Sequence, residues 1–248
     1  NAYGSNISNI ALVLGLTALI YPLQVQSEVL KKELPLLLAA TGVAAWQLLD
    51  GQITRLDGGV LLALFVGLLI WSLFQNRRSP VDPLIADIDD SMSKQTIPPT
   101  RCYVWLPISL AILVLSSRLV VTGAVDLAQW FGLSDLVIGL TVVAVGTSLP
   151  ELASTLVAAR RGERELALGN VLGSNLFNTL VVVGLAGVVT PLDVAPEVIR
   201  RDLPVMLGLT ILLLIFGIGR RGPGRINRVE GGAMLLLFVG YTTLLVLW

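Results

Sequence analysis

The chain has 248 residues, of which 54% are hydrophobic and only 14% are charged, against roughly 25% charged residues in an ordinary soluble domain. It contains 17 basic and 17 acidic residues, one cysteine and no histidine. This composition argues against a water-soluble fold. It also excludes histidine-ligated zinc, a histidine acid–base relay and a disulfide framework, and the balanced charge gives no indication of nucleic-acid binding.

Apolar segments predict eight membrane-spanning helices. A helix needs about 20 mostly apolar residues to cross about 30 Å of hydrocarbon. The segments, in chain order, lie at about 5–21, 35–50, 57–74, 103–127, 134–159, 167–190, 203–219 and 229–248. Long apolar runs separated by short polar joints fit helices rather than a barrel, whose strands would alternate at every second residue. We therefore expect an all-α polytopic membrane protein.

One segment, 75–102, is long and polar enough to be a solvated loop. When the spans are laid out in order, 13 of the 17 lysines and arginines fall on the same side of the membrane as this loop. Because basic residues accumulate in cytoplasmic loops, this bias predicts that the loop at 75–102 is cytoplasmic.

The chain contains an internal repeat. Asn1–Asn9 is similar to Asn170–Asn178, and the same offset carries 16 identities through the 38 positions that end at Leu38 and Leu207. A second block, 51–59, matches 224–232 after a shift of four residues. Five predicted spans separate the members of each pair, so one copy must be inverted relative to the other. Inverted repeats are typical of secondary transporters, which place their substrate near the midplane between the copies.

A single acidic residue, Glu151, lies deep within a predicted span, where it costs about 3 kcal/mol without a partner or a ligand. It follows Pro150, which cannot donate to the carbonyl of Gly146, so we expect the helix to open at this point. Thr147 and Ser148 add hydroxyl groups beside the opening. A carboxylate among neutral oxygens suits a hard cation such as Ca2+ or Na+.

Amide and hydroxyl side chains recur every four residues in two other spans. They are Asn170, Ser174 and Asn178 in the sixth span, and Asn1, Ser5 and Asn9 in the first. This spacing places each set on one helix face, so we expect two oxygen-bearing faces to meet at the midplane. Two less specific interpretations stay open: Glu151 as a structural carboxylate, and the serines and asparagines as hydrogen-bonding groups that only hold helices together.

The motif Gly146–Leu152, followed by Ala167–Asn178, resembles the second α-repeat of the calcium/cation antiporter superfamily, in its sodium/calcium exchanger branch. Residues 1–25 resemble the latter half of the first α-repeat. The proton-coupled branch carries a glutamate a few residues after its Gly-Asn pair. This chain has Val-Leu-Gly-Ser after Asn170, which favours sodium coupling.

The resemblance implies an inverted-repeat secondary transporter fold of ten helices, which exchanges Ca2+ for Na+ by alternating access in a bacterial or archaeal inner membrane. No cofactor is implied beyond these transported ions. The residues carried over by motif as the lining of the ion sites are Thr147, Ser148, Glu151, Ser174 and Asn178 from the second repeat, and Ser5 and Asn9 from the first. Some exchangers have aspartate where this chain has Asn178, so the ion stoichiometry does not transfer.

The resemblance implies ten helices in the complete fold, and we expect this chain to contain eight of them. They comprise a partial first repeat at 1–74 with three helices, the linker at 75–102, and a second repeat at 103–248 with five. We expect two further helices of the same protein upstream of Asn1, and a truncated chain that is inactive alone. The alternatives are a proton-coupled cation antiporter of the same fold and a non-transporting membrane scaffold. An enzyme is not expected, because one embedded carboxylate without histidine gives no obvious chemistry.

Overall fold

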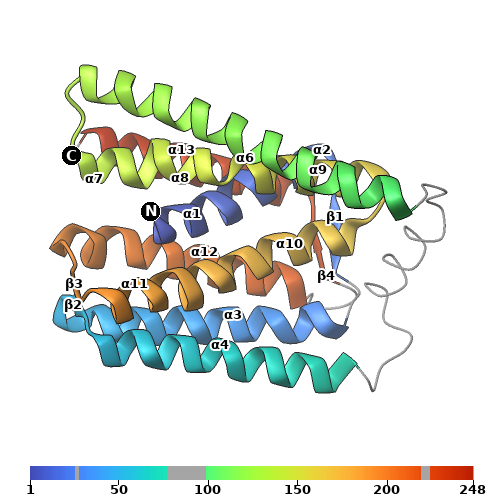
Figure 1. Cartoon of the computed structure of the whole chain (residues 1–248), viewed down its shortest axis with the longest axis horizontal. Helices are drawn as coiled ribbons and strands as arrows, with labels where there is room; N and C mark the ends of the chain where they lie inside the picture. The colour runs from blue at the N-terminus through green and yellow to red at the C-terminus, as the bar shows by residue number, and fades with distance from the viewer. Residues whose placement is uncertain (26–27, 77–98, 219–223, 248) are drawn as a thin grey trace.

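The computed structural model describes residues 1–25, 28–76, 99–218 and 224–247, which form a bundle of helices aligned along one direction (Figure 1). Six helical segments within these residues are long and apolar enough to cross a membrane. They are Ala2–Ile20, Arg55–Ser72, Tyr103–Trp130, Asp135–Arg161, Arg164–Val189 and Arg228–Leu245. Helices also lie in the other two predicted spans, 35–50 and 203–219. The helix in the first span has a larger share of charged residues than any of these six segments, and the helix in the second span is shorter.

The first part of the chain folds into three helical segments. Its elements are α1 (Ala2–Ser8), η1 (Asn9–Leu14), α2 (Gly15–Ile20), β1 (Leu23–Val25), α3 (Glu28–Gln47), η2 (Leu48–Asp50), β2 (Gln52–Ile53) and α4 (Arg55–Asn76). Of the predicted linker at 75–102, residues 77–98 lie outside the described residues.

The second part of the chain, from residue 99 onward, begins with the long helix α6. Its elements are α6 (Pro99–Trp130), α7 (Asp135–Ile138), η3 (Gly139–Val143), α8 (Ala144–Thr147), α9 (Leu149–Arg161), α10 (Arg164–Phe177), η4 (Asn178–Val182), α11 (Val183–Val189), β3 (Leu192–Asp193), η5 (Val198–Asp202), α12 (Leu203–Ile218), β4 (Gly224–Ile226) and α13 (Arg228–Leu247). The segment α12 has 16 residues and directly follows three charged ones, Arg200 to Asp202.

Two short antiparallel strand pairs show how the repeats are placed. Strand β1 pairs with β4, and β2 pairs with β3. The repeat makes β1 equivalent to β3 and β2 equivalent to β4, so the two pairs are images of each other. Figure 1 shows them at opposite ends of the bundle. The inversion predicted from the sequence is therefore observed in the fold.

The closest helix contacts follow the same symmetry. Helix α4 packs on α11, and α13 packs on α2. At the first contact a Cβ on Gly58 would lie 2.5 Å from the carbonyl oxygen of Gly184, and at the second a Cβ on Gly231 would lie 2.7 Å from that of Gly15. Only glycine permits this approach, and small residues at such crossings are typical of membrane helices.

The first helical segment and the long helix α6 differ in exposure. In the apolar window of Ala2–Ile20, 72% of the residues are buried, so this segment forms the centre of the bundle. No residue of the corresponding window of α6 is buried, and Figure 1 shows this helix crossing the outside of the bundle at an angle. The candidate site is thus built from the central segment and the helices that contact it.

Candidate ion-binding site

The helix that carries Glu151 is interrupted as the proline predicts. Helix α8 ends at Thr147 and α9 begins at Leu149, with Ser148 between them at φ −91° and ψ −1°. The carbonyl of Gly146, which Pro150 cannot reach with an N–H group, accepts a hydrogen bond of 2.6 Å from the Ser117 hydroxyl of α6. The freed oxygen is therefore held by a neighbouring helix instead of facing an open gap.

Glu151 lies in the first turn of α9 and is partly buried. Its Oε1 accepts a hydrogen bond of 3.1 Å from the hydroxyl of Ser174 on α10. Its Oε2 is buried and has no hydrogen-bond partner within the described residues. One carboxylate oxygen is thus held and the other is left without a donor.

Asn9, at the first residue of η1, is almost fully buried and faces the same serine. Its Nδ2 donates to the Oδ1 of Asn175 at 2.9 Å and to the Oγ of Ser174 at 3.4 Å. Its Oδ1 is a second buried oxygen to which the described part of the chain offers no donor. Ser174 therefore connects two groups that each keep a vacant acceptor oxygen, one from each repeat.

The other residues predicted for the site lie in separate contacts. Ser5 and Thr147 are joined by a hydrogen bond of 2.9 Å between their hydroxyls, and Thr147 is exposed. The Ser148 hydroxyl donates to the carbonyl of Ala144 in the preceding turn, at 2.9 Å. Asn178 donates to the Oδ1 of Asn6 at 3.2 Å. The structure therefore brings together Glu151, Ser174 and Asn9 directly, and the remaining four only through neighbouring turns.

Two asparagines in this region were not among the predicted site residues. Asn6 and Asn175 are 2% and 1% exposed, and each accepts a hydrogen bond from a predicted ligand. They are identical in the repeat alignment, in which Asn6 corresponds to Asn175. Their identity in the two repeats is a signal that the sequence contains. The four-residue spacing that predicts the ligands does not include these two positions.

Asp202 is a fully buried acid whose carboxylate is held by donors, in contrast to that of Glu151. Asp202 has no exposed surface. It accepts hydrogen bonds from Arg201 at 2.8 Å and from the hydroxyl of Tyr241 at 3.0 Å. The hydrogen bond to Asp202 raises the pKa of the Arg201 guanidinium. Glu151 has one hydroxyl donor and no ion pair within the described residues, so one of its carboxylate oxygens is not engaged.

A cavity of about 480 Å³ opens at the end of the bundle where β2 and β3 pair. Asn1, Asp135 and Asp193 are among its lining residues, but most of the lining is apolar and Glu151 does not belong to it. The vacant oxygens therefore lie outside this cavity, in the interior of the bundle.

The fold and the site define a class of protein: a helical, inverted-repeat membrane protein of the secondary-transporter type, with buried side-chain oxygens at the contact between its repeats. The family model described as sodium/calcium exchanger protein matches residues 1–74 and 102–247. The chain belongs to this family.

Named relatives and solved structures agree with this assignment. The chain is 44% identical over 246 residues to "Putative antiporter CaxA" of Alkalimonas amylolytica, covering 99% of this chain and 77% of the relative. It is 42% identical over 228 residues to "Inner membrane protein YrbG" of Escherichia coli strain K12, covering 90% and 69%. A structure of the sodium-calcium exchanger NCX_Mj, soaked with Na+ and Sr2+, superposes with a TM-score of 0.76 at 32% identity, covering 98% of this chain and 74% of that one.

Proposed function

We propose that the protein exchanges Ca2+ for Na+ by alternating access, and that Glu151, Ser174 and Asn9 hold the cation between the repeats. The observation that carries this proposal is the pair of buried oxygens without donors, Glu151 Oε2 and Asn9 Oδ1. A buried acceptor without a partner costs about 1–3 kcal/mol, and a cation in contact with both oxygens would remove that cost. Carboxylate, amide and hydroxyl oxygens are the ligands that such hard cations take.

The remaining predicted ligands extend the same site. Thr147 is the last residue before the helix break and Ser148 lies at the break, and Ser5 is in contact with Thr147. Asn178 occupies the position equivalent to Asn9 in the other repeat. In this proposal these four residues supply neutral oxygens, and Glu151 supplies the negative charge among the seven predicted ligands.

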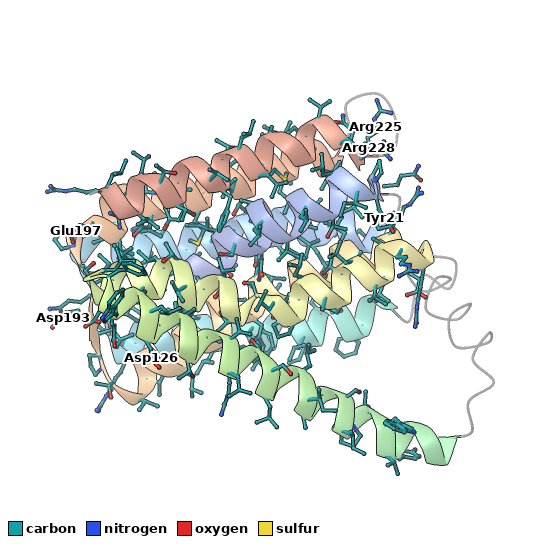
Figure 2. The ribbon with its side chains drawn as sticks, turned by 90° about the horizontal axis from the view of Figure 1, so that it is seen from above. Tyr21, Asp126, Asp193, Glu197, Arg225 and Arg228 are labelled. Carbon is teal, nitrogen blue, oxygen red and sulfur yellow. The ribbon has the colours of Figure 1, made fainter. Side chains whose placement is uncertain are left out.

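We further propose that the protein lies in the inner membrane with the end of the bundle near β1 and β4 toward the cytoplasm. Figure 2 shows Arg225 and Arg228 at that end, and Asp193 and Glu197 at the opposite end. Because basic residues favour the cytoplasmic side, this distribution supports a cytoplasmic location for the loop at 75–102. The name of the Escherichia coli relative, an inner membrane protein, agrees with the proposed location in the inner membrane.

The test is Ca2+ flux in proteoliposomes that contain the protein expressed from its complete coding sequence. A Na+ gradient should drive uptake of radioactive Ca2+, and a membrane potential should change the rate, since each net charge moved is worth about 2.3 kcal/mol per 100 mV. Glu151→Gln should abolish the uptake. Glu197→Gln is the matched control, because Glu197 is exposed at the end of the bundle.

The outcomes separate the alternatives. Ca2+ flux that ignores the Na+ gradient but collapses with the pH gradient would identify a proton-coupled antiporter. Normal transport by Glu151→Gln would overturn the site. Absence of both flux and Ca2+-dependent thermal stabilisation in the wild-type protein would favour a membrane scaffold.

A further inference from the structure

Two amide–amide hydrogen bonds, one buried and one partly buried, cross the interface between the repeats. Asn9 Nδ2 donates to Asn175 Oδ1 at 2.9 Å, and Asn178 Nδ2 donates to Asn6 Oδ1 at 3.2 Å. Asn9 is equivalent to Asn178 and Asn6 to Asn175, so exchanging the two repeats converts one bond into the other. In each bond the donor is a candidate cation ligand and the acceptor is not.

An asparagine side chain has two ends of nearly the same shape and opposite polarity. The oxygen attracts a cation, whereas the N–H groups repel it, so a ligand asparagine must present the correct end. An acceptor that binds the Nδ2 group decides this orientation. Asn9 shows the result: its Nδ2 is engaged by Asn175, and its Oδ1 is the buried oxygen left vacant.

The ligand asparagines also stand at equivalent points of irregular backbone. Asn9 is the first residue of the π-helical segment η1, and Asn178 is the first residue of the π-helical segment η4. Such segments are frequent at functional sites because they redirect the side chains that follow. We propose that Asn6 and Asn175 are positioning residues that turn the amide oxygens of Asn178 and Asn9 toward the transported cation, an inference that rests on the proposed function.

The two positioning residues are not held equally. Asn6 Nδ2 donates to the Oγ1 of Thr179 at 2.7 Å and lies 3.8 Å from the sulfur of Met206. A thioether sulfur can only accept a hydrogen bond, so these partners fix which end of Asn6 faces Asn178.

In the other repeat the positions equivalent to Thr179 and Met206 are Ile10 and Leu37, both buried and apolar. Accordingly, Asn175 Nδ2 is buried without a hydrogen-bond partner within the described part of the chain. The orientation of Asn9 is therefore held less firmly than that of Asn178.

The experiment measures the Ca2+ concentration for half-maximal transport in the Na+-driven assay. Asn6→Leu and Asn175→Leu keep the approximate size of the side chain and remove the acceptor. Loss of a group that orients a metal ligand costs about tenfold or more in affinity, so we expect at least a tenfold rise in the half-saturating Ca2+ concentration, with a smaller effect on the maximum rate. Asn6→Asp keeps an oxygen toward Asn178 and should restore most of the affinity.

Two further variants protect the test against misfolding. Thr179→Ile copies the other repeat and should weaken Ca2+ binding less than Asn6→Leu, because it loosens the acceptor without removing it. Thr17→Val alters a buried hydroxyl of the same span that makes no hydrogen bond within the described residues, and it should leave the half-saturating concentration unchanged. Ca2+-dependent shifts in melting temperature report binding for any variant that folds but transports poorly.

The two proposals fail separately. If the wild-type protein shows no Na+-driven Ca2+ flux, or Glu151→Gln transports normally, the proposed function is wrong. If Glu151→Gln is inactive while the folded Asn6→Leu and Asn175→Leu proteins keep the wild-type half-saturating concentration, the function stands and the positioning role is overturned. Equal loss of affinity in Asn6→Leu and Asn6→Asp would also overturn it.

Discussion

The crossing of α4 and α11 gives a prediction whose magnitude follows from the geometry. In Gly58→Ala the new methyl group would lie 2.5 Å from the carbonyl oxygen of Gly184 and 2.7 Å from the backbone nitrogen of Val188. Both are backbone atoms, so no change of side-chain rotamer can relieve the contact and the helices must separate. Overpacking of this kind costs about 1–3 kcal/mol, and we expect the upper end.

The intrinsic helix propensity acts in the opposite direction. Alanine is favoured over glycine within a helix by about 1 kcal/mol, so the expected net loss of stability for Gly58→Ala is about 2 kcal/mol. The neighbouring residue is a matched control, because a Cβ on Gly59 would meet no atom within 4 Å. Gly59→Ala should therefore stabilise the protein by up to about 1 kcal/mol through propensity alone.

Thermal unfolding of the purified proteins in one detergent measures the difference. Gly58→Ala should melt below the wild-type protein and Gly59→Ala at or above it. The repeat makes Gly231→Ala a second instance, since its Cβ would lie 2.7 Å from the carbonyl oxygen of Gly15. If Gly58→Ala melts with Gly59→Ala, the two helices can move apart at no cost, and the reasoning from close contact is refuted.

Two further variants test buried hydrogen bonds by the same measurement. Tyr241→Phe removes the hydroxyl that donates to the buried carboxylate of Asp202, and we expect a loss of about 1.5–3 kcal/mol because the acceptor is charged; an unchanged melting temperature would mean that Arg201 alone satisfies it. Ser117→Ala removes the donor to the carbonyl of Gly146 and should cost about 1–3 kcal/mol. Wild-type stability in that variant would show that the freed carbonyl finds another partner.

The sequence predicts those parts of the fold that depend on local residue patterns. Apolar length identifies spans, and a repeat at a fixed offset with an odd number of spans between its copies predicts inversion; the strand pairs at opposite ends confirm it. The helix break before Pro150 was also predictable, because the missing N–H group is a property of one residue.

The arrangement of the site was only partly predictable, for a physical reason. Helical spacing states that Asn170, Ser174 and Asn178 share a face, but not which neighbour each one meets. In the fold Asn170 donates to Ser154 and Thr155 of α9, whereas Ser174 reaches Glu151 and Asn178 reaches Asn6. The rotation of each helix about its axis relative to its neighbours determines these contacts. Residue spacing within one helix does not predict that rotation.

The symmetry of the contacts bears on how such a protein could alternate between two states. The strand pairs and the glycine crossings occur twice, once in relation to each end of the bundle, and they are made mainly by backbone atoms and apolar side chains. Opening either end would therefore disturb equivalent contacts at similar cost, which keeps two such states close in energy. A cation can shift an equilibrium only by its difference in affinity for the two states, so near-equal states are a condition for bound cations to control an exchange of the kind proposed. The vacant oxygen of Glu151 and the amide of Asn175, neither of which has a hydrogen-bond partner within the described residues, belong to the proposed cation site, where differences between bound ions would act.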